Sequence, residues 1–484
     1  GDGGTALANT INTGDGADTI VSGAGVDTIN SGDDGGSITS GAGNDNITSG
    51  DGADTITLGD GDDTVVTSGS GADIIDGGAG NDTVTTAGAG ADSVTGGAGN
   101  DDLSGGADND TLDGGAGNDT LNGDAGNDSI VGGDGNDAIT DGSGDDVVTG
   151  GDGVDTITIS SGNDNVDAGA GNDILSISGL SGADTITGGD GTDTLTITNS
   201  SAGTLTPSFT SIEAVVVNTS TNFALNLTNA TDKTSLKSYN ISSTSSTAAD
   251  DVTLTAIASG SVVTISDDDT WDGAATASAP ADTGNLDEVN VNTVDGGTLT
   301  LNVNANVDAL VHAATTVSPG AVTDLTGAAN VTITSSNGDS NDIQNSITAL
   351  GLDDDETQTL TLTANDSAGL IVGDITNSSA LQSITATAAA GAVSTIGTVI
   401  DAESLASLSI SASGASSSYS AGIIGGTTAA ALTSLSLSAS SAATVTVAQI
   451  DAASSSALTT VSITATGANS TINLHGTTKA LDLA

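Results

Sequence analysis

The sequence contains no cysteine and no methionine, only three basic side chains and few aromatic residues. Its 484 residues include one Trp, two Tyr and two Phe, so small aliphatic and hydroxyl-bearing side chains must form the core. The absence of cysteine excludes disulfide bonds. The formal net charge of −60 excludes a nucleic-acid-binding protein, because phosphate recognition needs a basic surface. No apolar run approaches the roughly 18 residues of a membrane-spanning helix, so no membrane span is expected.

The N-terminus shows no secretory signal and begins inside a Gly/Asp-rich tract. We infer that the sequence is a processed or partial piece of a longer protein. Its composition changes along the chain and predicts three parts. These are a Gly/Asp-rich repeat region at 1–199, an all-β domain with long loops at 200–356, and a repeat-built part with a C-terminal tail at 357–484.

The first part is a nine-residue repeat. In the copy Gly114–Asn122, GGAGNDTLN, glycines lie five, four and two residues before Asp119, and the aliphatic Leu121 lies two residues after it. Glycine permits a tight turn, the carboxylate supplies the hard oxygen that Ca²⁺ prefers, and the following triplet is a short strand with one inward side chain. We therefore predict calcium ligands at the aspartates of 19 units: Asp18, Asp27, Asp45, Asp54, Asp63, Asp73, Asp82, Asp92, Asp101, Asp110, Asp119, Asp128, Asp137, Asp146, Asp155, Asp164, Asp173, Asp184 and Asp193.

Two such units close one coil, and stacked coils form a right-handed parallel β-roll with ions in rows between successive turns. With this repeat, residues 14–198 resemble the repeats-in-toxin (RTX) calcium-binding family. The resemblance implies an RTX calcium-binding parallel β-roll over residues 1–199. A disordered Gly/Asp/Ser linker is the alternative that the low aromatic content favours. The strict phasing of an aliphatic residue argues against a linker.

Charge makes folding of this region depend on a cation. Residues 1–199 contain 37 Asp and no Glu, Lys or Arg. Bringing these carboxylates together without counterions costs far more than one aliphatic side chain per strand offsets, at roughly 0.8 kcal/mol per buried CH₂. One Ca²⁺ per unit would add a charge of +38 and nearly cancel the aspartates. We therefore expect multiple Ca²⁺ ions to bind and to drive folding.

Residues 200–484 predict further β-structure with a different composition. A new strand is expected over residues 209–217, and the Thr/Ser/Ala-rich remainder predicts a β-solenoid or β-sandwich-like half. Its last part repeats at 24 to 27 residues, with copies beginning at Leu381, Leu405, Leu432 and Leu458, each followed by a second apolar run. Units this short stack to bury a face, so the repeat favours a solenoid. The fold class is therefore all-β throughout.

Other candidate sites are weaker. Acidic loops at 267–272, 339–342 and 353–356 are rich enough in oxygen for additional calcium, but solvated loops are an equal alternative. His312 and His475 have no second ligand at metal spacing, so neither receives a role. Lys233 and Lys237 form the one basic spot; an acidic lattice neighbour or a lipopolysaccharide phosphate is a candidate partner, but a surface position without function is favoured. Because no catalytic motif occurs, we expect no enzyme activity.

Joined to its Thr/Ser/Ala-rich half, the roll resembles bacterial surface-layer (S-layer) proteins secreted by the Gram-negative type I route. That resemblance implies an extracellular or cell-surface structural protein that calcium folds and that assembles with copies of itself into a lattice or filament. A cell-surface glycan or lipopolysaccharide is a further candidate partner. The alternatives are a segment of a large RTX adhesin, the non-catalytic part of a secreted RTX hydrolase or toxin, and ice binding by outward T-x-T pairs such as Thr361 and Thr363.

Overall fold

The computed structural model describes most of the first 199 residues and the strands of the remainder. The described residues are 7–181, 183–199, 203–205, 208–219, 223–226, 238–243, 250–257, 261–267, 286–304, 325–336, 345–351, 359–365, 370–376, 381–389, 391–399, 404–424, 432–450 and 460–474. Within them every regular element is a β-strand, which confirms the all-β fold class. They belong to two compact units, a roll that takes in Leu205–Val215 and a C-terminal unit.

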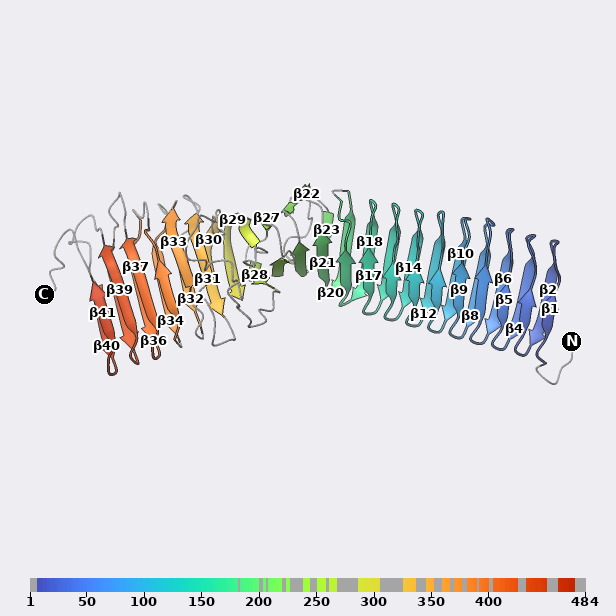
Figure 1. Ribbon diagram of the computed structural model, residues 1–484, viewed down its shortest axis with the longest axis horizontal. Helices are drawn as coiled ribbons and strands as arrows, with labels where there is room; N and C mark the ends of the chain where they lie inside the picture. The colour runs from blue at the N-terminus through green and yellow to red at the C-terminus, as the bar shows by residue number, and fades with distance from the viewer. Residues whose placement is uncertain are drawn as a thin grey trace, which may run out of the picture. The chain divides into compact units, whose positions relative to one another are not determined.

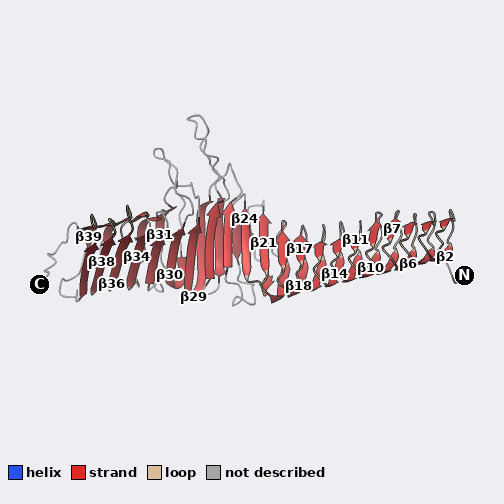
Figure 2. Cartoon of the chain, turned by 90° about the horizontal axis from the view of Figure 1, so that it is seen from below, coloured by secondary structure: helices blue, strands red, loops and turns tan. Residues whose placement is uncertain are grey.

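The roll is a stack of two-strand coils, seen as successive rungs in Figures 1 and 2. Each coil contributes one strand to each of two parallel sheets. The first sheet contains β1 (Thr10–Asn12), β3 (Thr28–Asn30), β5 (Asn46–Thr48), β7 (Thr64–Thr67), β9 (Thr83–Thr86), β11 (Asp102–Ser104), β13 (Thr120–Asn122), β15 (Ala138–Thr140), β17 (Thr156–Ile159), β19 (Ile174–Ile177) and β21 (Thr194–Asn199). The second contains β2 (Thr19–Ala24), β4 (Ser37–Ala42), β6 (Thr55–Asp60), β8 (Ile74–Ala79), β10 (Ser93–Ala98), β12 (Thr111–Ala116), β14 (Ser129–Asp134), β16 (Val147–Asp152), β18 (Asn165–Gly171), β20 (Thr185–Gly191) and β23 (Ser208–Thr210).

The core of the roll is a column of the repeat's aliphatic residues. All 19 are at most 5 % exposed, which confirms the predicted inward position. Parallel pairing aligns them from coil to coil, as with Leu103, Leu121 and Ile139. Glycine is needed in the turns because the coils approach closely: a Cβ on Gly117 would overlap the carbonyl oxygen of Gly99.

The roll continues beyond the predicted end of the repeat. The expected single strand over 209–217 is wrong, because β23 ends at Thr210 and a turn at Ser211, with φ of 52°, precedes β24 (Ala214–Thr219). Phe209 is buried and pairs with Ile186 of β20. Residues 208–217 therefore form one more coil segment, in which Glu213 takes the place of the repeat's aspartate. The boundaries at residues 199 and 356 stay predictions.

The described residues in the middle of the sequence form further parallel strands. These are β22 (Gly203–Leu205), β25 (Phe223–Asn226), β26 (Ser238–Ser243), β27 (Asp250–Ile257), β28 (Ser261–Asp267) and β29 (Leu286–Asn304). β25 pairs with β27 and β26 with β28, and both β27 and β28 pair with β29.

The C-terminal repeats form a second parallel solenoid, so the solenoid is correct and the sandwich-like alternative is not needed (Figures 1 and 2). Each unit supplies two strands, as predicted. One sheet contains β30 (Leu325–Ser336), β32 (Thr359–Ala364), β34 (Ser383–Ala389), β36 (Ser407–Ser413), β38 (Ser434–Ser440) and β40 (Thr460–Thr466); the other contains β31 (Asn345–Gly351), β33 (Leu370–Thr376), β35 (Val393–Ile396), β37 (Ser418–Ile424), β39 (Thr444–Ile450) and β41 (Thr471–Leu474).

Replacement of Leu435 by Ala removes a buried side chain from the interior of this solenoid. Leu435 is fully buried and aligned with Leu408 and Val461 of the adjacent coils. We expect the free energy of unfolding to fall by about 2–5 kcal/mol, because the substitution leaves a cavity. Thermal unfolding with calcium present measures the change. Ser436→Ala, on the outer face of the same strand, is the control and should cost less than about 0.5 kcal/mol. Equal losses would contradict the burial pattern.

Candidate metal centre

The predicted ligands form two rows, one along each line of turns. The first aspartate row precedes the strands of the first sheet and contains Asp27, Asp45, Asp63, Asp82, Asp101, Asp119, Asp137, Asp155, Asp173 and Asp193. The second aspartate row precedes the strands of the second sheet and contains Asp18, Asp54, Asp73, Asp92, Asp110, Asp128, Asp146, Asp164 and Asp184. All of them are buried except Asp18, which is half-buried.

One oxygen of each carboxylate is held by the neighbouring coil. Within a row, Oδ1 accepts a hydrogen bond from the backbone N–H of the aspartate one coil earlier; the bond from Asp101 to Asp119, for example, is 2.8 Å long. The ladder is continuous from Asp27 to Asp193 in the first row and from Asp54 to Asp184 in the second. Gly36 interrupts the second row: its N–H donates to Asp54, but it has no carboxylate to offer Asp18. The hydrogen bonds fix the carboxylates so that the other oxygen points into the roll.

That second oxygen has no hydrogen-bond donor. Among the residues that the structure describes, Oδ2 is buried and unpartnered at most positions of both rows. A buried anionic oxygen without a donor is strongly destabilised unless a cation lies beside it. The affected repeat aspartates are Asp18, Asp27, Asp45, Asp54, Asp63, Asp82, Asp101, Asp110, Asp119, Asp128, Asp137, Asp146, Asp155, Asp173 and Asp193.

Glycine leaves space beside many of these oxygens. We call the residue four positions after each aspartate the second inward position, because it follows the aliphatic residue on the same face of the strand. At Gly114 a Cβ would lie 2.5 Å from Oδ2 of Asp119 and 2.6 Å from the carbonyl oxygen of Gly132. Two oxygens thus border a space that exists because glycine has no side chain. We call such a space a glycine station; it occurs at Gly77, Gly96, Gly105, Gly114, Gly123, Gly132, Gly150 and Gly188, each beside the Oδ2 atom of the next aspartate.

Elsewhere a side chain occupies the second inward position. Hydroxyl side chains stand there at the N-terminal end, in Ser22, Ser31, Ser40, Ser49, Thr67 and Thr86, and aliphatic ones in Leu58, Ile159, Ala168, Ile177 and Ile197. The strands that include residues 156–159, 174–177 and 194–197 have Ile in this position, and both of their inward side chains are buried. The aspartates are therefore uniform along the roll, whereas the space beside them is not.

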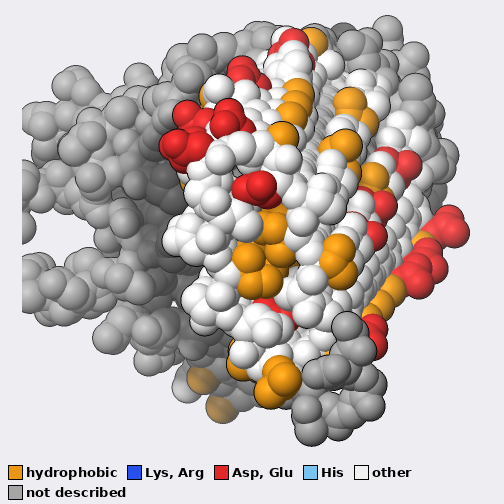
Figure 3. Space-filling view, turned by 90° about the vertical axis from the view of Figure 1, so that its right-hand side faces the viewer, with side chains coloured by type: hydrophobic (Ala, Val, Ile, Leu, Met, Phe, Trp, Pro, Cys, Tyr) orange, Lys and Arg blue, Asp and Glu red, His pale blue; other side chains and the backbone are white. Residues whose placement is uncertain are grey.

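Burial and like charge raise the pKa of many of these carboxylates, which therefore hold protons unusually tightly. No Lys or Arg occurs in this part of the sequence, and Figure 3 shows acidic side chains gathered along the edges of the roll with no basic side chain in view. Loss of hydration is the main cause of the raised pKa values, neighbouring aspartates add to it, and the backbone hydrogen bonds oppose it. The pKa is raised to about 6 for Asp63, Asp82, Asp155, Asp164 and Asp193, and to about 7 for Asp110 and Asp141.

The arrangement fits a hard cation. Carboxylate and carbonyl oxygens are the ligands that Ca²⁺ takes, and a divalent charge would reverse the penalty of burying the carboxylates. Comparison with protein families agrees with this geometry: residues 3–38, 32–68, 65–88, 86–121, 104–139, 122–157, 140–175 and 176–196 match the RTX calcium-binding nonapeptide repeat. The roll is built from RTX calcium-binding repeats. No curated protein and no solved structure matches the chain.

Sequence reasoning missed two features of the RTX roll. Glu213 ends the first aspartate row, because its Oε2 atom accepts a hydrogen bond of 2.7 Å from the N–H of Asp193. The signal was its position, 20 residues after Asp193, the same interval that separates Asp173 from Asp193. The second feature is an outer ladder, in which the Oδ1 atom of an asparagine accepts the N–H one coil later. It recurs at Asn81, Asn100, Asn109, Asn118, Asn127, Asn136 and Asn172, and the recurrence of Asn directly before Asp was its signal.

The weaker sequence candidates are not described by the structure. Residues 268–272, 339–342 and 353–356, the two histidines and both Lys233 and Lys237 lie outside the described residues, and of Asp267 only its backbone, at the end of β28, is described. In the described ranges no helix is long and apolar enough to cross a membrane.

Gly114→Ala should remove one calcium ion from the RTX roll. Its Cβ would fill the glycine station beside Asp119, while the fully buried Ala168 shows that alanine fits the second inward position. We expect bound calcium, measured by mass spectrometry after dialysis, to fall by one per chain and the calcium concentration for folding to rise. The reciprocal change Ala168→Gly opens a station and should add one ion. Unchanged stoichiometry in both variants would contradict the assignment.

The calcium-free and calcium-loaded protein should respond to pH in opposite directions. The raised carboxyl pKa values mean that the folded, metal-free RTX roll binds protons more tightly than the unfolded chain, so its stability falls as pH rises through about 4 to 7. With calcium, protons compete with the ion, so stability rises over the same window. Far-UV circular dichroism at about pH 5 and pH 7.5 tests both signs. A metal-free protein with more β-structure at the higher pH would contradict the prediction.

Proposed function

We propose that this RTX protein is an extracellular structural protein that calcium folds and that assembles with copies of itself into a surface layer or filament. Extracellular calcium modules bind in the range of roughly 10⁻⁴–10⁻³ M, well above cytosolic calcium. A roll with this affinity stays unfolded inside the cell and folds after export. The buried carboxylates, which lack any basic partner in the sequence around them, support this coupling. Export through a Gram-negative type I system is part of the proposal.

Assembly is supported by one end of the C-terminal solenoid. In the interior coils, Leu435 and Leu437 of β38 are fully buried. Val461 and Ile463 continue the same two columns in β40, yet Val461 is half-buried and Ile463 is 44 % exposed. Among the described strands β40 pairs with β38 alone, so no described strand covers its other edge. An open parallel edge with apolar side chains is a template for another strand.

The fold supports a structural role in preference to catalysis. Both units are stacked coils, and the acidic groups of the roll lie buried between coils where they suit ion binding. We therefore propose that the chain has no enzymatic activity. The self-association surface is the β40 edge; a glycan or lipopolysaccharide contact stays a prediction from the sequence.

Calcium should convert the purified chain from monomers into ordered sheets or fibres at millimolar concentration, seen by light scattering and electron microscopy. Ile463→Asp places a charge in the exposed column and should raise the protein concentration needed for assembly by about tenfold or more, equivalent to roughly 1.4 kcal/mol. Ser462→Asp, on the opposite face of β40, is the charge-matched control. A wild-type chain that folds with calcium but stays monomeric would favour an adhesin segment or the non-catalytic part of a secreted hydrolase or toxin.

A further inference from the structure

One second inward position in the roll is acidic. Asp141 follows β15 and lies four residues after Asp137, so it occupies a second inward position. The equivalent residues, which also lie beside the second aspartate row, are Gly105 and Gly123 in the two preceding coils and Ile159 in the following coil. The Asp141 carboxylate therefore enters a space that is a glycine station one coil earlier. One coil later Ile159 fills the equivalent space, so Asp141 occupies the last position before the aliphatic side chains begin.

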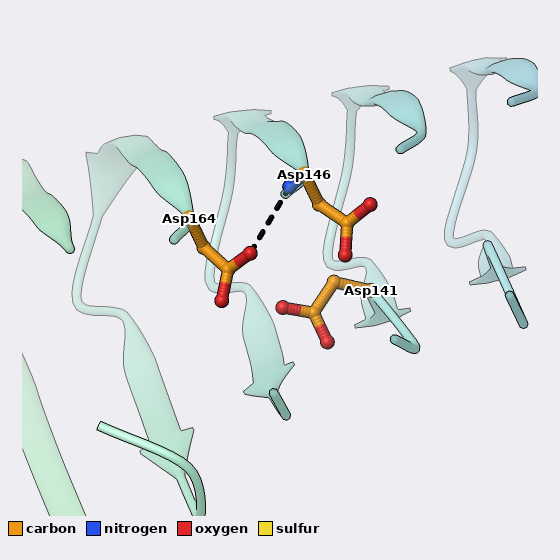
Figure 4. Close-up of side chains that lie close together, drawn as sticks. All are labelled: Asp141, Asp146 and Asp164. Carbon is orange, nitrogen blue, oxygen red and sulfur yellow. Dashed lines mark hydrogen bonds between the residues drawn. The ribbon is translucent and has the colours of Figure 1, made fainter. Parts of the chain in front are cut away.

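Asp141 brings a third carboxylate to the second aspartate row. Among the described residues, Asp141, Asp146 and Asp164 form one acidic cluster. Each contributes a carboxylate oxygen, and these three oxygens lie within 4.8 Å of one another. Figure 4 shows the Asp141 carboxylate directed toward the other two, which come from successive coils. All three residues are at most 2 % exposed.

The geometry of this cluster indicates a bound cation and not merely a group of neighbouring carboxylates. Oδ1 of Asp141 accepts hydrogen bonds from the backbone N–H groups of Gly142 and Ser160, at 2.6 and 2.9 Å. These bonds hold the carboxylate in place. Its Oδ2 atom and that of Asp146 are buried and have no hydrogen-bond partner. The sequence from residue 1 to 199 contains no Lys or Arg, so no side chain there neutralises three converging carboxylates.

We propose that Asp141, Asp146 and Asp164 form a three-carboxylate site that holds one hard cation, Ca²⁺ or a trivalent lanthanide, more tightly than the glycine stations. At a glycine station the carboxylate ligands come only from the aspartate row, and backbone carbonyls complete the coordination shell. The three-carboxylate site adds a further anionic oxygen, from Asp141. Calcium affinity rises with the number of charged ligands and with the rigidity of the site, and backbone hydrogen bonds hold the Asp141 and Asp164 carboxylates. The site does not depend on self-assembly and can be measured on dilute monomers.

Calcium retention in the full chain tests the proposal. Protein is dialysed against chelator-buffered Ca²⁺ from about 10⁻⁶ to 10⁻² M, which spans the sensor and extracellular ranges, and bound calcium is counted by mass spectrometry. We expect the wild type to keep one ion per chain at concentrations about tenfold below those at which the other ions leave. Asp141→Gly recreates the glycine of the preceding coils and should lose this last ion while folding at saturating calcium. Asp141→Asn, which keeps the side-chain volume, should lose it as well.

Asp145→Asn is the matched control. Asp145 is exposed, adjoins Asp146 in the sequence and accepts hydrogen bonds from Asn163 through Oδ1, an atom that asparagine retains. It removes the same formal charge without touching the site, so the last ion should be retained. Asp141→Gly with a wild-type retention curve would overturn the proposal. Asp141→Gly that gains an ion would also overturn it, because the Asp141 side chain would then occupy an ion's place.

Discussion

Buried like charge is the constraint on which the roll depends. Two rows of carboxylates run through its turns, one oxygen of each fixed by a backbone N–H and the other left without a donor. Desolvation and mutual repulsion both oppose this arrangement, and the sequence around it provides no basic side chain. A divalent cation between successive turns would offset both the desolvation and the repulsion of the carboxylates. We therefore propose that folding of the roll and binding of calcium are one process.

The two described units solve the same stacking problem with different chemistry. A solenoid coil cannot bury a face alone, so each coil depends on its neighbours. In the C-terminal unit the described strands β32, β34, β36 and β38 each have three apolar inward side chains, as with Leu408, Ile410 and Ala412 of β36. In most coils of the roll each strand has one aliphatic residue, and glycine or a hydroxyl side chain takes the second inward position beside the aspartates. Apolar burial in one unit is replaced by ion coordination in the other.

Along the roll, the second inward position changes from glycine to aliphatic side chains beside the second aspartate row. Beside the second aspartate row, glycine stations occur at Gly105 and Gly123, whereas Ile159, Ile177 and Ile197 fill the equivalent place in later coils; beside the first row a station remains at Gly188. The later coils thus bury more apolar area, and their stability depends less on the cation.

The sequence by itself determined the roll's repeat, its 19 inward aliphatic residues and the two-strand units of the C-terminal solenoid. These follow from local periodicity, since a residue's place in a nine-residue turn and strand fixes which way it points. Only the tertiary structure decided what each residue meets in the next coil. Glu213 joins the aspartate ladder, Asp141 meets Asp146 and Asp164, and glycine stations stand beside some aspartates and not others. The contacts of Glu213 with Asp193 and of Asp164 with Asp146 join residues about two repeats apart, and coil closure and insertions such as the longer steps before Asp73 and Asp184 set that distance.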